Sequence, residues 1–346
     1  MSELLSKICR KCSPILIFML FLQTSHAQTD FSGLTAIINK NEKSLGKDYV
    51  VLVNKAGKNI FLKETEDLKL KTPAPIASCS KWLTAAVVMI FVDEGKIDLD
   101  EPVAKYLPIY EKYMKGYITL RHCLTHTTGV EGDAMGLMKF AQRSKFASLE
   151  EEVNNFAAKR LIVDKPGTHF AYSSVGLNTA ARVLEVITKK TFDRIAQEKL
   201  FRPLGMKNTT FFNENGPMNP SGGAVSTAFD YSIFMQMILN KGVFNGKRIL
   251  SEKSVELLCT NQFPEAQIRT MPEVANGFTY AMGNWIQEKD EQGKGTVFSS
   301  PGLFGTWPWI DVKRNYVAIV FVKSLLTEQK RDLYMKIKES VDQVIQ

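Results

Sequence analysis

Residues 75–81 read Pro75-Ile76-Ala77-Ser78-Cys79-Ser80-Lys81, and the apolar segment 82–92 follows directly. A segment that is apolar on every side predicts a buried helix. Ser78 then lies at the start of this helix, with Lys81 on the same face because residues i and i+3 are neighbours. The helix N-terminus adds free N–H groups and a partial positive charge beside the hydroxyl. A lysine placed in this way can activate a serine nucleophile without a histidine.

The Ser-x-x-Lys pattern does not by itself identify a nucleophile, because it fixes only two positions. A second copy, Ser44 with Lys47, lies in a polar stretch that no apolar segment follows. Ser78 is also suited to be an N-cap residue, which would make its role structural. The remainder of the sequence has to separate these two interpretations.

The composition is that of an ordinary globular protein. The chain has 346 residues, of which 45% are hydrophobic, and a formal net charge of +8. Its basic residues are spread along the chain without an arginine cluster among aromatics, so we expect no nucleic-acid partner. Of the five cysteines, Cys79, Cys123 and Cys259 follow residue 27. They are far apart and odd in number, which favours buried free thiols over a disulfide framework.

The first 27 residues have the pattern of a secretory signal peptide. Lys7, Arg10 and Lys11 precede an apolar run at 15–22, and Ser25-His26-Ala27 fits a cleavage site. We therefore expect a signal peptide over 1–27 and a periplasmic or secreted protein. The apolar run is too short to span a bilayer, and no later segment is long and apolar enough, so no integral membrane segment is expected after signal removal.

The order of helical and strand-like segments predicts an α+β fold. A helix over 30–47 precedes a hairpin at 49–53 and 59–62. Residues 98–242 are helical and rich in loops. Strands follow at 278–286, 296–298, 306–310 and 316–322, and a helix closes the chain at 325–345. We expect one antiparallel sheet of five or six strands flanked by helices, with a helical insertion domain. The predicted sheet-containing domain is 28–97 with 243–346, and the helical domain is 98–242.

Tyr172 is the first candidate partner of Ser78. It lies after a Pro-Gly turn at 166–167 and just before a helix that begins at Val175, with Ser174 as its expected cap. A nearby lysine ammonium lowers the pKa of a tyrosine. Tyr172 is then able to take the Ser78 proton and pass it to a leaving group. A buried tyrosine held by one hydrogen bond is the structural alternative.

A second candidate is the segment Ser300-Pro301-Gly302. Proline is confined to strand edges and bulges, and glycine permits a close approach of two backbones. These properties suit a strand beside a cleft, where a backbone N–H stabilises an oxyanion. An ordinary strand end with a turn is the alternative.

Together these segments resemble the serine β-lactamase and penicillin-recognising superfamily. The resemblance is to class C β-lactamases, D-alanyl-D-alanine carboxypeptidases and related esterases, and it covers about residues 30–340. The segments occur in the family's order: 78–81, 124–129, 166–174, 203–206, 222–227 and 300–302. The resemblance implies a β-lactamase/transpeptidase-like fold.

The resemblance also implies roles for individual residues. Ser78 is the expected nucleophile that forms an acyl-enzyme, Lys81 its proton-handling partner, and Tyr172 the base of the family's Tyr-x-Asn element. The backbone N–H groups of Ser78 and Leu303 are the expected oxyanion hole. His126 and Thr128 are expected to hold a loop rather than to contact substrate.

Two departures from the family pattern concern substrate binding. Ser174 replaces the asparagine of Tyr-x-Asn, and Ser300-Pro301-Gly302 replaces Lys-Thr-Gly or His-x-Gly. Ser300, Gly302 and Ser174 remain the expected substrate-binding residues. Losing a charge-assisted contact to a substrate carboxylate weakens binding by about 1.5–3 kcal/mol. We therefore expect weak or absent β-lactamase activity and favour an esterase, amidase or D-peptidase acting on a small-molecule or peptide substrate.

Three competing interpretations remain. His122 and His126, with Glu131 and Asp133 nearby, have the spacing of zinc ligands, but Cys123 stands where an HExxH motif has its glutamate. We expect no metal and no other cofactor. A Ser-His-Asp hydrolase would need a base such as His169, and the chain has no Gly-x-Ser-x-Gly elbow. The third alternative is a catalytically degenerate ligand-binding protein of the cell envelope. The sequence predicts no particular oligomeric state.

Overall fold

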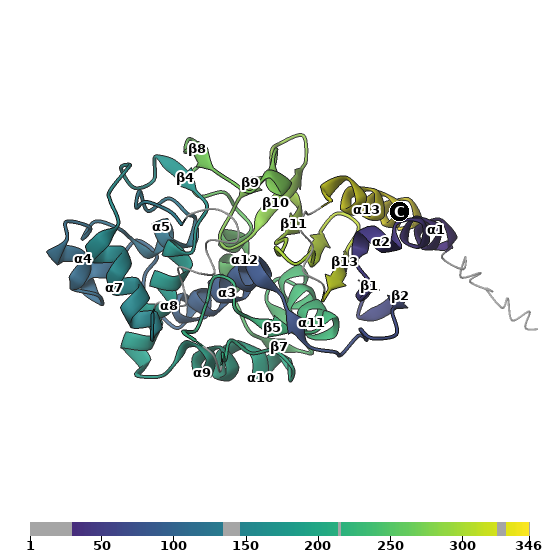
Figure 1. Ribbon diagram of the computed structural model, residues 1–346, viewed down its shortest axis with the longest axis horizontal. Coiled ribbons are helices and arrows are strands. Elements are labelled where there is room, and N and C mark those ends of the chain that lie inside the picture. The colour runs from purple at the N-terminus through teal and green to yellow at the C-terminus, as the bar shows by residue number, and fades with distance from the viewer. Residues whose placement is uncertain (1–29, 134–145, 214–215, 324–329, 346) are drawn as a thin grey trace, which may run out of the picture.

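The computed structural model describes residues 30–133, 146–213, 216–323 and 330–345 (Figure 1). The signal peptide predicted for 1–27 lies outside these described residues. Every helix in the described ranges is too short or too polar to cross a bilayer.

A seven-stranded antiparallel sheet forms the centre of the molecule. Its strand order is β2-β1-β13-β12-β11-β10-β9, one or two strands more than predicted. The first and last strands along the chain are neighbours, since β1 pairs with β13 in the register Val51↔Val320. The strands are β1 (Tyr49–Lys55), β2 (Lys58–Glu64), β9 (Thr279–Tyr280), β10 (Trp285–Lys289), β11 (Gly295–Ser299), β12 (Trp307–Asp311) and β13 (Tyr316–Val322).

The additional strand arises because the segment 278–286, predicted as one strand, folds back on itself. Gly283 has a φ of +75°, in the left-handed region that favours glycine. The chain turns there, and β9 pairs with β10 in the register Tyr280↔Trp285. A Cβ on Gly283 would also lie 2.6 Å from the Lys81 carbonyl oxygen. The turn therefore packs directly against the helix that follows Ser78.

Both faces of the sheet are covered, which explains the unbroken apolar sequence of β13. Val317, Ile319 and Phe321 point into one core cluster, whereas Ala318, Val320 and Val322 point into the other. This alternation is the two-residue period of a strand. Helices α1 (Ser32–Lys40) and α13 (Arg331–Val344) contribute to the second cluster, and α3 (Ser80–Asp93) and α11 (Ala228–Leu239) contribute to the first.

The remaining helices gather at the end of the molecule away from α1 and α13 (Figure 1). They are α4 (Ile109–Lys112), α5 (Leu120–Leu124), α7 (Leu149–Lys159) and α8 (Val175–Thr188), with α9 (Phe192–Ala196) and α10 (Arg202–Leu204) beside them. Helix α11 belongs to the segment 98–242 but packs on β12 and β13. The domain limits predicted from the sequence stay a prediction.

Short elements complete the chain. Helix α2 (Glu42–Leu45) follows α1, and α12 (Glu252–Leu258) has Ser251 as its N-cap, whose hydroxyl accepts from the Ser254 N–H. The pairs are β3 (Ala74–Pro75) with β5 (Val225–Ser226), β4 (His169–Ala171) with β8 (Gln267–Thr270), and β6 (Val243–Phe244) with β7 (Lys247–Arg248).

Candidate active site

Ser78 lies half-buried in a tight turn between β3 and α3, with buried residues on both sides of it in the sequence. A single 3₁₀ turn covers Ala77–Cys79, and α3 begins at Ser80 with Cys79 in the N-cap position. Ala77 has a φ of +45°, a strained conformation for a residue with a side chain. The structure therefore removes the N-cap interpretation of Ser78. Backbone strain of this kind clusters at functional sites, which favours the nucleophile interpretation.

Segments distant in the sequence hold this turn in place. The Ile76 N–H donates to the Ala224 carbonyl at 3.0 Å, next to the β3–β5 pairing. The Tyr231 hydroxyl donates to the Cys79 carbonyl at 2.9 Å. The Ser80 hydroxyl donates to the Ala77 carbonyl at 2.6 Å and accepts from the Ala224 N–H at 3.0 Å. The turn that carries Ser78 is thus bonded on both sides.

Lys81 lies beside Ser78, as the i, i+3 spacing predicts. Its side chain is buried, and its Nζ donates to the Ser78 Oγ at 3.2 Å and to the Ser221 carbonyl at 2.7 Å. The same Nζ lies 4.6 Å from the centre of the Tyr172 ring, within cation–π range. These contacts bring Ser78, Lys81 and Tyr172 together from two distant parts of the chain. Their catalytic roles stay predictions.

The pKa of Tyr172 is raised, which makes the lowered value expected from the sequence wrong. Burial is the largest cause, and the nearby Cys79 thiol adds to the rise, whereas the hydrogen bond with Ser78 acts in the opposite direction. The ring is packed against His126, at 4.6 Å between centroids, and against Trp285, at 5.5 Å. In this environment Tyr172 is a neutral phenol at neutral pH.

His126 supports the aromatic cluster around Tyr172. It is buried with a φ of +57°, and its Nε2 is 3.1 Å from the Tyr280 hydroxyl. His122 faces elsewhere: its Nδ1 contacts Thr119, and its ring stacks on Phe263 at 5.3 Å. Within the described ranges, no group of three or more His, Cys, Asp or Glu side chains is arranged to hold a metal ion.

Ser174 is buried and hydrogen-bonded within the protein. Both its backbone N–H and its hydroxyl donate to the Asp133 Oδ2, at 2.7 and 2.5 Å. The Asp133 Oδ1 in turn accepts from Arg160 at 2.8 Å. Ser174 occupies the predicted N-cap position of α8, but its hydroxyl bonds to Asp133 and makes no capping hydrogen bond. A substrate contact by Ser174 stays a prediction.

The Ser300-Pro301-Gly302 segment continues β11 past the Ser78 turn. The Ser300 Oγ is 3.3 Å from the Ser78 carbonyl and 3.5 Å from the Gly283 carbonyl. A Cβ on Gly302 would lie 2.4 Å from the Ile76 carbonyl oxygen and 3.1 Å from the Cys79 Sγ. The close backbone approach expected from this glycine is therefore present. Leu303, the other expected oxyanion donor, follows directly and is exposed.

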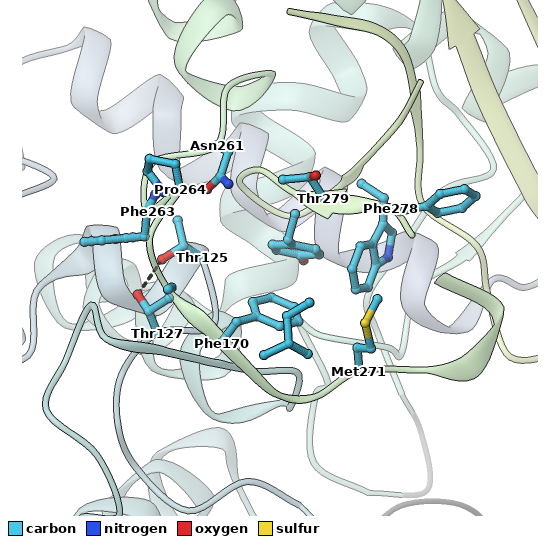
Figure 2. A pocket seen from close by; sticks show the side chains of 13 residues that line it. Thr125, Thr127, Phe170, Asn261, Phe263, Pro264, Met271, Phe278 and Thr279 are labelled. Carbon is cyan, nitrogen blue, oxygen red and sulfur yellow. Dashed lines mark hydrogen bonds between the residues drawn. The ribbon is translucent and has the colours of Figure 1, made fainter. Parts of the chain in front are cut away.

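A cavity of about 160 Å³ is lined in part by rings of the aromatic cluster around Tyr172 (Figure 2). Phe170, Tyr280 and Trp285 form part of its wall, and the same three rings pack around His126 or Tyr172. Thr125 and Thr127, hydrogen-bonded to each other at 2.9 Å, close one side. Its lining comes from segments other than the turn that carries Ser78.

Two residues that bind expected site residues, Ser221 and Asp133, were missed in the sequence. No acidic partner was identified there for His169. Ser221 supplies the carbonyl that binds Lys81, although only the following Gly222-Gly223 had been singled out. Asp133 was considered only as a metal ligand, whereas it binds Ser174. His169 does have an acidic partner, since its Nδ1 is 3.1 Å from Asp164. A backbone carbonyl has no signature in a sequence, so Ser221 offered no signal.

Known proteins provide an independent comparison. The protein-family model described as Beta-lactamase matches residues 22–341. A D-alanyl-D-alanine carboxypeptidase/endopeptidase of Escherichia coli, AmpH, is 26% identical over 290 residues, which are 76% of this chain and 74% of AmpH. A solved structure of a candidate β-lactamase from Bacteroides dorei superposes with a TM-score of 0.80 and 28% identity, covering 90% of this chain and 99% of that one.

A further solved structure shows the same fold at lower identity. EstCE1, a hydrolase with promiscuous acyltransferase activity, has a TM-score of 0.75 and 16% identity, over 91% of this chain and 99% of that one. The β-lactamase/transpeptidase-like fold expected from the sequence is confirmed. From the extent of the family match and the agreement in fold, this chain belongs to the β-lactamase family, a group of serine hydrolases.

Proposed function

We propose that this protein is a secreted serine hydrolase that cleaves an ester or amide bond through an acyl-enzyme on Ser78. One observation carries the proposal: the buried Lys81 Nζ is 3.2 Å from the Ser78 Oγ and is held there by the Ser221 carbonyl. A lysine buried beside a serine at a strained turn is what nucleophile activation requires. Periplasmic or extracellular localisation rests on the sequence pattern of residues 1–27.

In the acylation step, the Ser78 oxygen bonds to the substrate carbonyl carbon and its proton passes to Lys81. This role requires Lys81 in its amine form, and it leaves the Tyr172 phenol, whose pKa is raised by burial, as the proton donor to the leaving group. The Ser78 and Leu303 N–H groups stabilise the oxyanion. The bond to the leaving group then breaks, Tyr172 donates its proton to that group, and Lys81 returns the proton to Tyr172.

Deacylation reverses these roles. A water molecule attacks the acyl-enzyme, and its proton passes to the Lys81–Tyr172 pair while its hydroxyl bonds to the acyl carbon. The bond to Ser78 breaks, the acid is released, and Ser78 recovers a proton from the pair. Two coupled groups of this kind titrate together, so the pH profile of the reaction reports apparent pKa values of the pair.

The substrate side of the site supports an esterase, amidase or D-peptidase in preference to an efficient β-lactamase. Ser300 supplies no cation for a substrate carboxylate, and its hydroxyl lies near two backbone carbonyls. The Ser174 hydroxyl is bonded to Asp133. The relative AmpH is named a D-alanyl-D-alanine carboxypeptidase/endopeptidase, which supports including D-peptides among the substrates to be tested.

The nucleophile is tested by incubating the purified protein with a fluorophosphonate and mapping the adduct by mass spectrometry. An adduct on Ser78 is expected, with fluoride released as the oxygen–phosphorus bond forms. On the same preparation, p-nitrophenyl esters, D-amino-acid amides and a chromogenic cephalosporin should be compared. Cephalosporin hydrolysis at the rate of the best substrate would overturn the substrate assignment.

The second candidate function is a ligand-binding protein of the envelope that has lost catalysis. The observation that favours it is the engagement of Ser174 by Asp133, which leaves that hydroxyl committed to the protein. This candidate predicts no fluorophosphonate adduct on Ser78. It also predicts that a D-alanyl peptide binds, as measured by calorimetry, without being hydrolysed.

A further inference from the structure

A carboxylate and an amide are buried together between α7 and α8. Glu152 and Asn178 are 2% and 0% exposed. The Asn178 Nδ2 donates to the Glu152 Oε2 at 3.0 Å. Burying a carboxylate is unfavourable unless hydrogen bonds compensate it, so this pair needs a reason to lie in the core of a helix pair. The mechanism above makes no use of either residue.

The other end of the Asn178 amide fixes the loop that contacts Lys81. The Asn178 Oδ1 accepts from the Ser221 N–H at 2.9 Å. A carboxylate can only accept hydrogen bonds, so Glu152 requires the Asn178 NH₂ group to face it. The amide oxygen is then directed at Ser221. Glu152 therefore fixes the orientation of the Asn178 amide, so that its oxygen, and not its nitrogen, faces the Ser221 N–H.

The same Ser221 residue binds Lys81 through its carbonyl, at 2.7 Å. Three residues further along α3, the Thr84 hydroxyl donates to the Pro220 carbonyl at 2.6 Å. The 220–221 segment is thus held by α3 on one side and by Asn178 on the other. A continuous hydrogen-bonded chain runs from Glu152 through Asn178 and Ser221 to Lys81 and Ser78.

We propose that Glu152 and Asn178 are positioning residues for the nucleophile. They set the position of the Ser221 carbonyl, and this carbonyl holds the Lys81 Nζ within reach of Ser78. The inference rests on the proposed function, because it concerns how fast Ser78 is acylated. It makes the helical segments α7 and α8 part of the activation of a serine that lies outside them.

The test reverses the donor and acceptor in the pair. Asn178→Asp places two carboxylates against each other, so the chain to Ser221 should break. Adding Glu152→Gln restores one amide and one carboxylate, with Gln donating to Asp and Asp accepting from Ser221. Glu152→Gln alone should have a smaller effect, because its amide oxygen can still accept from Asn178. Glu151→Gln, on the exposed face of the same helix, is the matched control.

The readout is the rate of fluorophosphonate labelling of Ser78, normalised to the fraction finally labelled, with thermal unfolding to verify folding. Asn178→Asp should slow labelling about tenfold to hundredfold, as expected for a broken buried hydrogen bond. The double variant should recover to within about threefold of the unsubstituted protein. The labelling rate of Asn178→Asp, divided by that of the unsubstituted protein, should also rise as the pH falls. The reason is that a proton shared between the two carboxylates restores the hydrogen bond between them.

The outcomes separate the two proposals. Normal labelling by every variant, or an Asn178→Asp defect that Glu152→Gln does not relieve in folded protein, would overturn the positioning role alone. If the unsubstituted protein is not labelled at Ser78, the proposed function fails and the positioning role fails with it. Recovery in the double variant, with the pH-dependent ratio, supports the inference when thermal unfolding shows every variant to be folded at the labelling temperature and pH, because the labelling rate then reports the site and not the folded fraction.

Discussion

The two sides of the candidate site differ in how closely they follow the family pattern. On the nucleophile side, Ser78, Lys81 and Tyr172 are all present and in contact. On the substrate side, Ser300 and Ser174 replace the usual residues, and both lie against other parts of the protein. Under the proposed function, acyl chemistry and substrate recognition are then carried by separate groups. A change on one side should therefore affect rate, and a change on the other should affect selectivity.

The largest effect is expected for Ser78→Ala. Removing the nucleophile of a hydrolase lowers kcat by about 10⁴-fold or more, so ester hydrolysis and fluorophosphonate labelling should both disappear. The control is Ser44→Ala, which alters the second Ser-x-x-Lys copy and should leave both readouts unchanged. Activity retained by Ser78→Ala would show that the nucleophile side has been wrongly identified.

Lys81→Arg should lower kcat by about 10²–10⁴-fold, the usual contribution of a proton-transfer group. Arginine keeps a positive charge but does not lose its proton. The remaining base would then be the Tyr172 phenolate. Because burial raises the pKa of Tyr172, this phenolate forms only at alkaline pH. The ascending limb of the kcat/KM profile should consequently move to higher pH.

The pH profile is measured with a p-nitrophenyl ester and an exposed lysine substitution, Lys253→Arg, as the control. A Lys81→Arg enzyme with an unshifted profile would mean that Lys81 does not take part in proton transfer. Tyr172 would then have to be reassigned along with it.

Gly302→Ala tests the contact between the two sides. Its Cβ would lie 2.4 Å from the Ile76 carbonyl, so the strand has to move away from the Ser78 turn. Overpacking of this kind lowers stability by about 1–3 kcal/mol, and activity should fall about tenfold to hundredfold because a small misplacement is enough. Thermal unfolding and kcat/KM measure the two effects. Gly33→Ala, in α1, places a Cβ at an ordinary contact distance of 3.8 Å from the Ser340 Oγ, so it should leave kcat/KM unchanged and should not lower stability.

The smallest effect is expected for Ser300→Lys, which changes only the substrate side. A cation there should raise kcat/KM for carboxylate-bearing substrates by about tenfold relative to neutral ones. The matched control is Ser300→Met, which has similar length and no charge. The measured quantity is the ratio of the two kcat/KM values, so a general loss from crowding cancels. An equal ratio for both variants would mean that recognition does not depend on this position.

Much of the fold was predictable because it depends on local periodicity. The apolar strand β13 and the apolar helix α3 were both expected from the pattern of neighbouring residues. The split of 278–286 into β9 and β10 was missed, because a glycine in an apolar run gives no measure of its φ. The contact between Lys81 and Ser221 was also missed, since Ser221 lies 140 residues away along the chain.

By itself, the sequence determined that Ser78 and Lys81 share a face at the start of a buried helix, since helical geometry fixes that relation. Only the tertiary structure decided the direction of the Tyr172 pKa shift, because burial outweighs the hydrogen bond with Ser78 that lowers this pKa. It also decided that Ser174 binds Asp133 and that Glu152 and Asn178 connect to Lys81 through Ser221. These properties depend on desolvation and on contacts between distant segments, which no local pattern encodes.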